Sequence, residues 1–308
     1  MERLANLRRI CASSDRDHRV TNMPQTVSAV IPTIGRPELR AAVESALAQT
    51  YAIHEVVVGA DTSDDLDLPD DPRVKVVRTG PRAGGNVARM AAIEAATGEL
   101  IALLDDDDVW VPEKLQRQIS VISESSNSIW VSSTQVLEPG GRAWPERLFA
   151  RGERLPHYLF RKSSIRAGQG AMHTSTLIFP RSLVLEAPFD RSLRFHQDTD
   201  WLVQLDHKMP NIEVIQVVEP LTALREGDGS VSRGIDPLKS LAWAKRSLEH
   251  LDRRTRGEFL LTVTYWQALR HKRARGRVLW NAFTWGRPGW KAVPSVVFLP
   301  LKNLLRRG

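Results

Sequence analysis

The chain has 308 residues, of which 42% are hydrophobic and 26% are charged, and its formal net charge is +7. At about 100–200 residues per domain this length suits one large domain or two modest ones, and the composition excludes wholesale disorder, collagen and coiled coil. The single cysteine, Cys11, excludes a disulfide framework and a cysteine-rich zinc site. The apolar runs are far shorter than the ~20 residues that span a membrane, and the basic start has no apolar segment typical of a secretory signal.

The charge is divided unevenly along the chain. Residues 233–308 hold 17 Lys and Arg against 4 Asp and Glu, whereas residues 1–232 hold 26 against 32. Opposite charge in two parts of one chain indicates two roles. We therefore expect a flexible N-terminal tail over residues 1–24, a main domain over residues 25–232, and a basic, tryptophan-containing helical region over residues 233–308.

The first 110 residues alternate short apolar runs with segments of helical periodicity. The predicted strands are Val27–Pro32, His54–Val58, Val74–Val77 and Leu100–Leu104. One predicted helix opens at Arg36-Pro37-Glu38, with proline in its first turn, and a second runs from Gly84-Gly85 through Ala96. This alternation predicts an α/β fold with a parallel sheet and helices on both faces, in which ligands bind beyond the carboxyl ends of the strands.

The pattern is less regular in the middle third of the chain. A helix is predicted from His196 to Leu205, with Asp198 or Asp200 near its start. The remaining strands are predicted at Ser128–Gln135, Ser175–Phe179 and Pro210–Val218. Beyond Arg233 the sequence turns helical and basic.

Four consecutive carboxylates, Asp105–Asp108, follow directly on the apolar strand Leu100–Leu104. Their mutual repulsion needs an offset, which a divalent cation supplies, because Mg²⁺ and Mn²⁺ prefer carboxylate, phosphate and water oxygens. The competing interpretation is a solvated turn whose aspartates cap the helix before Val111-Pro112-Glu113. The position at the carboxyl end of a strand favours a functional site.

Several short motifs follow one another in order over about residues 26–232. The first part of the chain contains Val30-Ile31-Pro32-Thr33 with Arg36-Pro37, Glu55–Val58 with Asp61–Asp65, then Gly84, Arg89, Ala95–Ile101 and Leu104–Leu115. The later part contains Phe189-Asp190 and Gln197–Leu202. In this order and spacing the motifs resemble family 2 glycosyltransferases. The resemblance implies a GT-A fold (Rossmann-like, with a mostly parallel sheet), a nucleotide-sugar half over residues 25–115 and an acceptor half over residues 116–232. It also implies an inverting sugar transfer from a nucleotide-diphospho-sugar.

The resemblance also implies roles for single residues. Thr33 and Asp61 match positions that hold the nucleotide base, Asp107 matches the ligand of a divalent cation, Mn²⁺ or Mg²⁺, and Asp198 matches the base that activates the acceptor. The full set of implied nucleotide-binding residues is Pro32, Thr33, Asp61, Gly84, Arg89, Asp105 and Asp106, the last two on the ribose side.

These roles agree with what the reaction requires. A cation bridging Asp107 and both phosphates would act as a Lewis acid on the departing nucleoside diphosphate. A carboxylate within hydrogen-bond reach of the attacking hydroxyl can take its proton, and Asp198 is the candidate. Inversion needs only this one base, on the face opposite the leaving group.

Each of these residues also has a structural alternative. Asp198 or Asp200 can cap the following helix, and Asp61 can bond the backbone of its own loop. Arg89 can be a surface helix residue, and Gly84-Gly85 can be only a turn. Two histidines, His173 and His196, flank the acceptor region, and both are interpreted as structural residues rather than as metal ligands.

The chain departs from the family pattern at three places. Ala60 stands where a first acid often precedes Asp61, and Gln197 stands where a Glu-Asp pair often precedes the acceptor helix. Gly227 stands where a histidine often lies near the diphosphate, and Asp228 is a candidate substitute.

Residues 259–308 carry ten Lys and Arg and no acidic residue. The tryptophans interleaved with them are Trp266, Trp280, Trp285 and Trp290. This composition suits peripheral contact with an anionic membrane surface, and it equally suits a helical subdomain whose tryptophans pack on the core. Nucleic acid is not an expected partner, because no recognition motif accompanies the charge.

The sequence therefore predicts a cytoplasmic, metal-dependent glycosyltransferase with a glycan or lipid-linked acceptor, active in cell-surface polysaccharide or glycolipid synthesis. Under one interpretation of the tail it is peripheral at the inner face of the cell membrane. One alternative is a sugar nucleotidyltransferase, but Pro32–Arg36 lacks the glycine-rich phosphate loop of that class. The other is a non-enzymatic module that binds nucleic acid or membrane, which leaves the position of Asp105–Asp108 unexplained.

Overall fold

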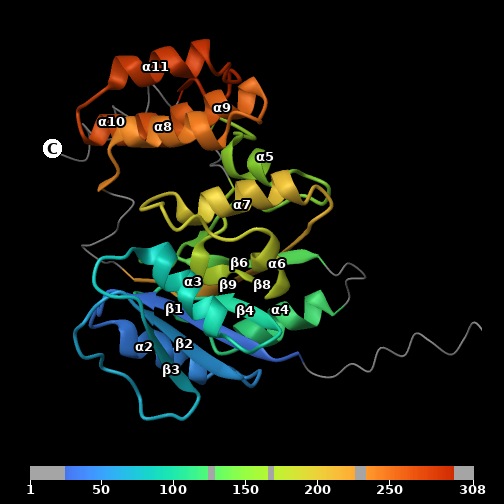
Figure 1. Cartoon of the computed structure of the whole chain (residues 1–308). Helices are drawn as coiled ribbons and strands as arrows, with labels where there is room; N and C mark the ends of the chain where they lie inside the picture. Colours follow the sequence, from blue (N-terminus) through green and yellow to red (C-terminus); the bar gives the residue numbers. More distant parts are fainter. Residues whose placement is uncertain (1–24, 124–128, 166–169, 226–233, 295–308) are drawn as a thin grey trace, which may run out of the picture.

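The computed structural model of the chain describes residues 25–123, 129–165, 170–225 and 234–294. These residues form a mixed nine-stranded sheet flanked by helices, with a further stack of helices at one end (Figure 1). The predicted tail over residues 1–24, both Gly227 and Asp228, and the basic region from residue 295 onward lie outside the described residues.

The N-terminal half is a parallel sheet. Its strands are β1 (Val27–Thr33), β2 (Glu55–Ala60), β3 (Val74–Arg78) and β4 (Leu100–Leu103). They lie in the order β3-β2-β1-β4, with every neighbouring pair parallel. The helices between them are α2 (Leu39–Leu47) and α3 (Gly85–Ala95). All four predicted strands of this half are confirmed to within two residues at either end.

Both faces of strands β1, β2 and β4 are buried, whereas the edge strand β3 is partly exposed. Along β1, Ala29 and Ile31 pack into the core beneath α2, whereas Val30 points to the opposite face and packs into the core that contains Ile93 of α3. Successive side chains of a strand point to opposite faces, so a strand covered on both sides needs apolar residues throughout. Access for a ligand is therefore left at the ends of the strands.

The second half of the sheet is mixed. Its strands are β5 (Asp108–Trp110), β6 (Trp130–Leu137), β7 (Ala143–Trp144), β8 (Ile178–Pro180) and β9 (Glu213–Leu224). Strand β8 pairs antiparallel with β4 and with β6, β6 pairs parallel with β9, and β5 pairs antiparallel with β9. The helices of this half are α4 (Lys114–Ile122), α5 (Leu155–Phe160), α6 (Ser182–Glu186) and α7 (Gln197–Lys208). The all-parallel sheet predicted from the strand–helix alternation thus holds for β1–β4 only.

One strand prediction was wrong at its start. The segment Ser175–Phe179 begins not as a strand but as the 3₁₀ turn η1 (Thr174–Thr176), and the strand starts at Ile178. The side chain of His173 accepts a hydrogen bond from the Ser175 N–H, and this cap favours a turn over an extended chain. The last residue of the acidic run, Asp108, already belongs to β5, a strand that the sequence did not predict.

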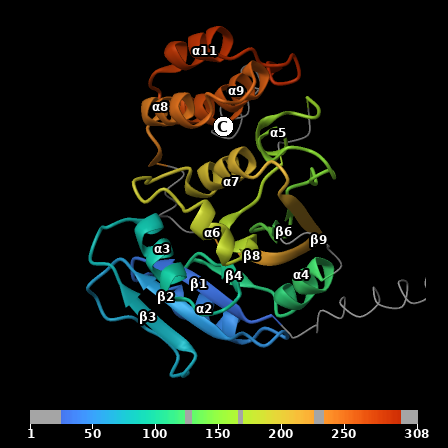
Figure 2. The same ribbon diagram turned by 45° about the vertical axis from the view of Figure 1, so that its right-hand side comes forward.

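The basic region contributes helices that pack against the main domain. They are α8 (Pro237–Ser247), α9 (Arg253–Phe259), the π-helical η3 (Leu260–Thr264), α10 (Tyr265–Arg270) and α11 (Arg275–Thr284). Asp236 and Asp252 accept hydrogen bonds from backbone N–H groups at the starts of α8 and α9, which explains where these helices begin. Both views place this stack beyond α5 and α7, away from β3 (Figures 1 and 2). Among the helices of the described ranges, none has the length and apolar character needed to cross a membrane.

A buried hydrogen bond ties the basic region to helix α7. Trp243 of α8 donates from Nε1 to Asp200 Oδ1 at 2.7 Å, and burial raises the pKa of the Asp200 carboxyl group. Replacing Trp243 with Phe keeps an aromatic ring but removes this donor. We expect Trp243→Phe to lower the free energy of unfolding by about 1–3 kcal/mol, the cost of leaving a buried polar group short of a partner. A thermal melt measures the loss.

The matched control for this substitution is Trp280→Phe, because Trp280 is 71% exposed on α11. Exposed positions tolerate such changes within about 0.5 kcal/mol. Equal melting temperatures for the two variants would mean that the bond between Asp200 and Trp243 does not stabilise the fold.

Candidate active site

A cavity of about 890 Å³ opens at the carboxyl ends of β1, β2 and β4. The sequence pattern predicts a ligand at this position, because ligands of open parallel sheets bind beyond the carboxyl ends of the strands. It is lined by all nine residues that were predicted to hold nucleotide, metal or acceptor: Pro32, Thr33, Asp61, Gly84, Arg89, Asp105, Asp106, Asp107 and Asp198. The fold therefore brings together residues from strands, loops and helices that are up to 166 positions apart in the sequence.

The middle of the acidic run is neutralised by an arginine. Asp106 accepts a hydrogen bond from Thr33 Oγ1 at 2.6 Å and forms an ion pair with Arg36, whose Nη1 lies 2.7 Å from Asp106 Oδ1. The same Arg36 Nη1 lies 2.9 Å from Asp107 Oδ2. Burial raises the pKa of Asp106, and the bonds to Thr33 and Arg36 oppose that rise. Arg36 was predicted only as part of a family motif and not as a site residue. Its place three residues after Thr33, beyond the carboxyl end of β1, is the signal that would have marked it as a site residue.

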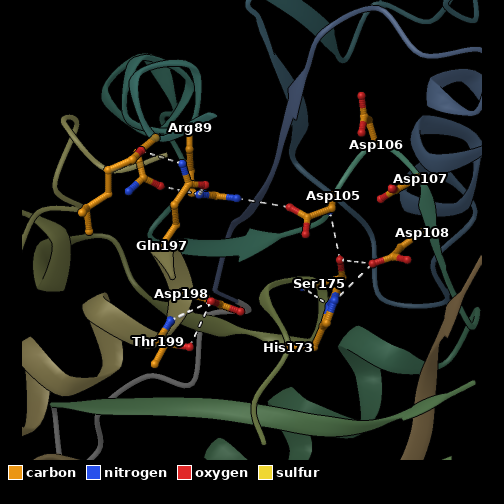
Figure 3. Close-up of polar contacts among 12 residues, drawn as sticks. Arg89, Asp105, Asp106, Asp107, Asp108, His173, Ser175, Gln197, Asp198 and Thr199 are labelled. Carbon is orange, nitrogen blue, oxygen red and sulfur yellow. Dashed lines mark hydrogen bonds and ion pairs between the residues drawn. The ribbon is translucent and has the colours of Figure 1, made fainter. Parts of the chain in front are cut away.

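The two ends of the acidic run form a second cluster with a histidine. The carboxylate oxygens of Asp105 and Asp108 and a ring nitrogen of His173 all lie within 4.8 Å of one another. Ser175 supports the cluster, because its Oγ donates to Asp108 Oδ2 at 2.6 Å and accepts from the Asp105 N–H at 3.0 Å (Figure 3). Burial raises the pKa of Asp108, and the nearby His173 opposes that rise.

This cluster offers the donor set that divalent cations bind, namely two carboxylates and one imidazole. The sequence interprets His173 as a structural residue, and besides capping η1 its ring lies 3.6 Å from Asp108 Oδ2 at the wall of the cavity. No spacing rule could have found this contact, because 65 residues separate His173 from Asp108 and the two segments meet only in the folded sheet, through the β4–β8 pairing and a hydrogen bond from Trp110 Nε1 to the Ser175 carbonyl.

Arg89 links helix α3 and the acidic run to helix α7. Its side chain extends from α3 and donates to Asp105 Oδ1 at 3.2 Å and to Gln197 Oε1 at 3.3 Å (Figure 3). Arg89 is only 4% exposed, so the alternative of a surface helix residue is wrong. Its Nε is buried without a hydrogen-bond partner among the described residues, which leaves one donor of the guanidinium unsatisfied at the cavity wall.

Asp61 shapes the loop that opens α3. Its two carboxylate oxygens accept hydrogen bonds from the N–H groups of Ala83 and Gly84, at 2.6 and 2.7 Å. The alternative that Asp61 bonds its own loop is therefore wrong, because the contacts reach the next loop along the chain. Gly84 has a φ of +114°, and a Cβ there would collide with the guanidinium of Arg194. Only glycine fits this position, because it has no Cβ and adopts a positive φ readily. The absence of a side chain thus allows both the turn and the close approach of Arg194 at the cavity.

Asp198 enters the cavity from the first turn of α7. It does not cap that helix, because its Oδ1 accepts from the N–H of the next residue, Thr199, at 2.7 Å. The N-cap is His196, a non-glycine residue with a φ of 54°. The His196 ring is held 2.9 Å from Ser240 Oγ and packs on Trp243. Burial lowers the pKa of His196 to about 4, so this ring is neutral at pH 7 and serves to fix the start of α7.

A second cavity of about 330 Å³ adjoins the first at Asp198. The residues that line both cavities are His173, His196, Asp198 and Thr199. Beyond this junction the wall of the second cavity is mostly apolar: Trp144, Leu159, Phe160, Gly170, Ala171, Met172, Phe259 and Val263. Asp198 therefore lies between a polar, acid-lined space and a smaller apolar one, and part of the apolar wall comes from α9 and η3 of the basic region.

The chain is similar to known glycosyltransferases. The chain is 25% identical over 224 residues to the amylovoran biosynthesis glycosyltransferase AmsB of Erwinia amylovora, covering 67% of this chain and 72% of AmsB. It is 32% identical over 118 residues to the UDP-Glc:alpha-D-GlcNAc-diphosphoundecaprenol beta-1,3-glucosyltransferase WfgD of Escherichia coli, covering 36% of this chain and 46% of WfgD.

A solved structure shares the fold. The crystal structure of S. aureus TarS 1-349 in complex with UDP-GlcNAc superposes with a TM-score of 0.53 at 16% sequence identity, covering 88% of this chain and 78% of TarS 1-349. The predicted GT-A fold with a helical C-terminal region is thereby confirmed. The family model described as Glycosyl transferase family 2 matches residues 28–185, and the chain belongs to that family.

Proposed function

We propose that this glycosyltransferase is an inverting enzyme that moves a sugar from a nucleotide-diphospho-sugar to a hydroxyl group of a glycan or lipid-linked acceptor. The observation that carries the proposal is the single cavity that both the acidic run and Asp198 line (Figure 3). The names of AmsB and WfgD support a role in the synthesis of a cell-surface polysaccharide or glycolipid.

The donor nucleotide would bind at the ends of β1 and β2. Pro32, Thr33 and Asp61 lie at these strand ends and line the cavity, in position to hold the base. Asp105 and Asp106 lie beyond β4 on the ribose side. Arg89, with its unsatisfied Nε, supplies positive charge beside Asp105 for the nucleotide.

The acidic run fits a divalent cation by the chemistry of its donors. Asp107 is the proposed ligand, and the cluster of Asp105, Asp108 and His173 offers three further donor atoms within 4.8 Å of one another. A cation held here would neutralise the charge that develops on the departing nucleoside diphosphate. Arg36, which forms ion pairs with Asp106 and Asp107, also lines the cavity. Its guanidinium group would add positive charge beside the proposed cation.

Asp198 is the proposed general base. Its carboxylate would take the proton of the acceptor hydroxyl while that oxygen bonds to the anomeric carbon and the bond to the diphosphate breaks on the opposite face. The bond from the Thr199 N–H fixes the orientation of the carboxylate. We infer that the acceptor enters from the second cavity, since that space meets the donor cavity at Asp198 and has apolar walls suited to the C–H face of a sugar or to lipid.

We also infer which role each part of the chain has. Residues 25–115 would bind the donor and residues 116–232 the acceptor. Residues 233–308 would complete the acceptor side and attach the enzyme to its cellular site. That site would be the cytoplasmic face of the cell membrane, where lipid-linked acceptors are anchored, with peripheral contact through residues 259–308.

A panel of nucleotide-diphospho-sugars, each assayed with Mn²⁺, with Mg²⁺ and with EDTA, tests this proposal. We expect one donor to release its nucleoside diphosphate in a cation-dependent way, slowly into water and faster when glycan or lipid-linked acceptors are added. A sugar nucleotidyltransferase would instead release pyrophosphate from a nucleoside triphosphate and a sugar phosphate. A non-enzymatic module would release nothing from any donor, and either result would overturn the proposal.

A further inference from the structure

The outer face of helix α11 has an unusual composition for a surface that meets water. Along this helix Val278, Asn281 and Ala282 are buried against the neighbouring helices. The opposite face presents Trp280, which is 71% exposed, and Phe283, which is 50% exposed. Residues three apart on a helix lie side by side, so these two rings form one apolar patch. Both views place α11 as the outermost helix of the stack (Figures 1 and 2).

Exposed aromatic side chains gather in this part of the described structure. Trp290, in the turn that follows α11, is 68% exposed. The large hydrophobic residues exposed elsewhere in the described ranges are all aliphatic: Ile34, Val76, Val121, Ile129, Ile165, Leu185 and Val218. Single exposed aliphatic residues are normal on protein surfaces, but three exposed aromatic rings within eleven residues are a feature of an interaction surface.

The charge around these rings has one sign. The α11 segment, defined here as residues 275–293, contains Arg275, Arg277, Arg287 and Lys291 and no acidic residue. The three arginines are exposed. Just before the segment, Lys272 and Arg273 are also exposed, and Asp236 pairs with the second of them at 3.1 Å. A partner that covers the segment must therefore carry negative charge and accept aromatic rings.

We propose that the α11 segment docks on the surface of an anionic lipid bilayer. Tryptophan prefers the boundary between headgroups and acyl chains, and arginine and lysine are attracted to acidic headgroups, so one bilayer surface satisfies both features. An acidic protein would match the charge but offers no general site for three rings. Helix α11 has only 10 residues, too few to cross a membrane, so the attachment is peripheral.

The two interpretations of the basic region, packing on the core and contact with a membrane, apply to different tryptophans. Trp285 packs against the main core and under Arg256, whereas Trp280 and Trp290 face outward. The region thus both packs on the core and presents a docking surface. Helix α10, which packs against α11, contributes Arg270 to the lining of the main cavity. Docking at α11 would hold the donor cavity close to the membrane.

Vesicle co-sedimentation of the full chain tests the inference. The vesicles are pure phosphatidylcholine, and phosphatidylcholine with about 30% phosphatidylglycerol, at low and high salt. We expect the wild type to sediment with the acidic vesicles, less so at high salt. The variant Trp280→Ser, Phe283→Ser, Trp290→Ser should bind them at least about tenfold more weakly. Its matched control is Leu185→Ser, because Leu185 is 81% exposed on α6 and lies outside the segment.

A second variant keeps the rings and reverses the charge. Arg277→Glu with Arg287→Glu should also bind at least about tenfold more weakly, whereas Arg151→Glu with Arg181→Glu, which changes the net charge equally at exposed positions of the main domain, should bind like the wild type. Circular dichroism melts on the same samples confirm that each variant is folded.

Several results would overturn the inference. The wild type could bind neither vesicle, the variants of the segment could bind as well as the wild type, or the control variants could lose binding equally. A fourth contradicting result is a salt-sensitive self-association in sedimentation velocity that the serine variant abolishes, without vesicle binding by any protein. The inference rests on the peripheral membrane contact proposed above for residues 259–308 and narrows it to the α11 segment, and its test is separate from that of the proposed reaction. Absence of donor turnover in every protein, with the vesicle results as expected, would remove the proposed function and leave the docking surface.

Discussion

Asp198→Asn is expected to lower kcat by about 10²–10⁴, the usual contribution of a general base, while the affinity for the donor stays nearly unchanged. Asparagine has almost the same shape, and its side-chain oxygen can still accept the bond from the Thr199 N–H, so α7 should begin as before. The amide cannot take a proton from the acceptor hydroxyl. Initial rates over a range of donor and acceptor concentrations, with a separate nucleotide titration, measure both quantities.

The matched control is Asp200→Asn, two residues further along the same helix. Asp200 is buried against Trp243 and does not line either cavity among the described residues. This variant should lower the melting temperature and change kcat little. A collapse of donor affinity in Asp198→Asn, with kcat preserved, would move Asp198 into the donor site and leave the base unassigned.

Asp107→Asn is expected to abolish turnover and to weaken the binding of Mn²⁺. The substitution removes a charged oxygen from the acidic run, and carboxylate oxygen is the ligand that Mn²⁺ and Mg²⁺ prefer. It also removes one of the two carboxylates that Arg36 contacts. The measurement is a Mn²⁺ titration by electron paramagnetic resonance, run with and without nucleoside diphosphate and beside the rate assay.

His173→Asn is the informative companion, because the histidine belongs to the other donor set. Loss of Mn²⁺ affinity in His173→Asn alone would assign the cation to the cluster with Asp105 and Asp108 instead of Asp107. Wild-type rates in Asp107→Asn, or full activity in EDTA, would contradict a metal ligand at position 107 altogether.

The parallel half of the fold could be predicted because each of its signals is local. Strands such as Val27–Thr33 are buried on both faces and are therefore mostly apolar along their whole length, with Ser28 the one polar residue before the last position. Polar residues directly after such runs had to meet at one edge of the sheet, which is why Asp61 and Asp105 were placed together from the sequence alone.

The rest of the site depends on contacts that leave no local signal. Strands β5 and β8 have three residues each, too few for any periodicity, and both are strands only because longer neighbours pair with them. His173 reaches Asp108 through that pairing. The second cavity is likewise invisible in the sequence, since Trp144 and Phe259 come from segments that show no shared pattern.

The link between Asp200 and Trp243 bears on how enzymes of this kind can be recombined. The family match ends at residue 185, yet the helix that presents Asp198 begins at Gln197 and is fastened to α8 through His196–Ser240 and Asp200–Trp243. The C-terminal helices and the start of α7 therefore form one packed unit. A chimaera that takes its first part from a relative should be joined upstream of α7 and keep α7 with α8–α10 from one parent. A junction between α7 and α8 would place Asp198, the proposed proton acceptor, on a helix whose supporting contacts come from another protein.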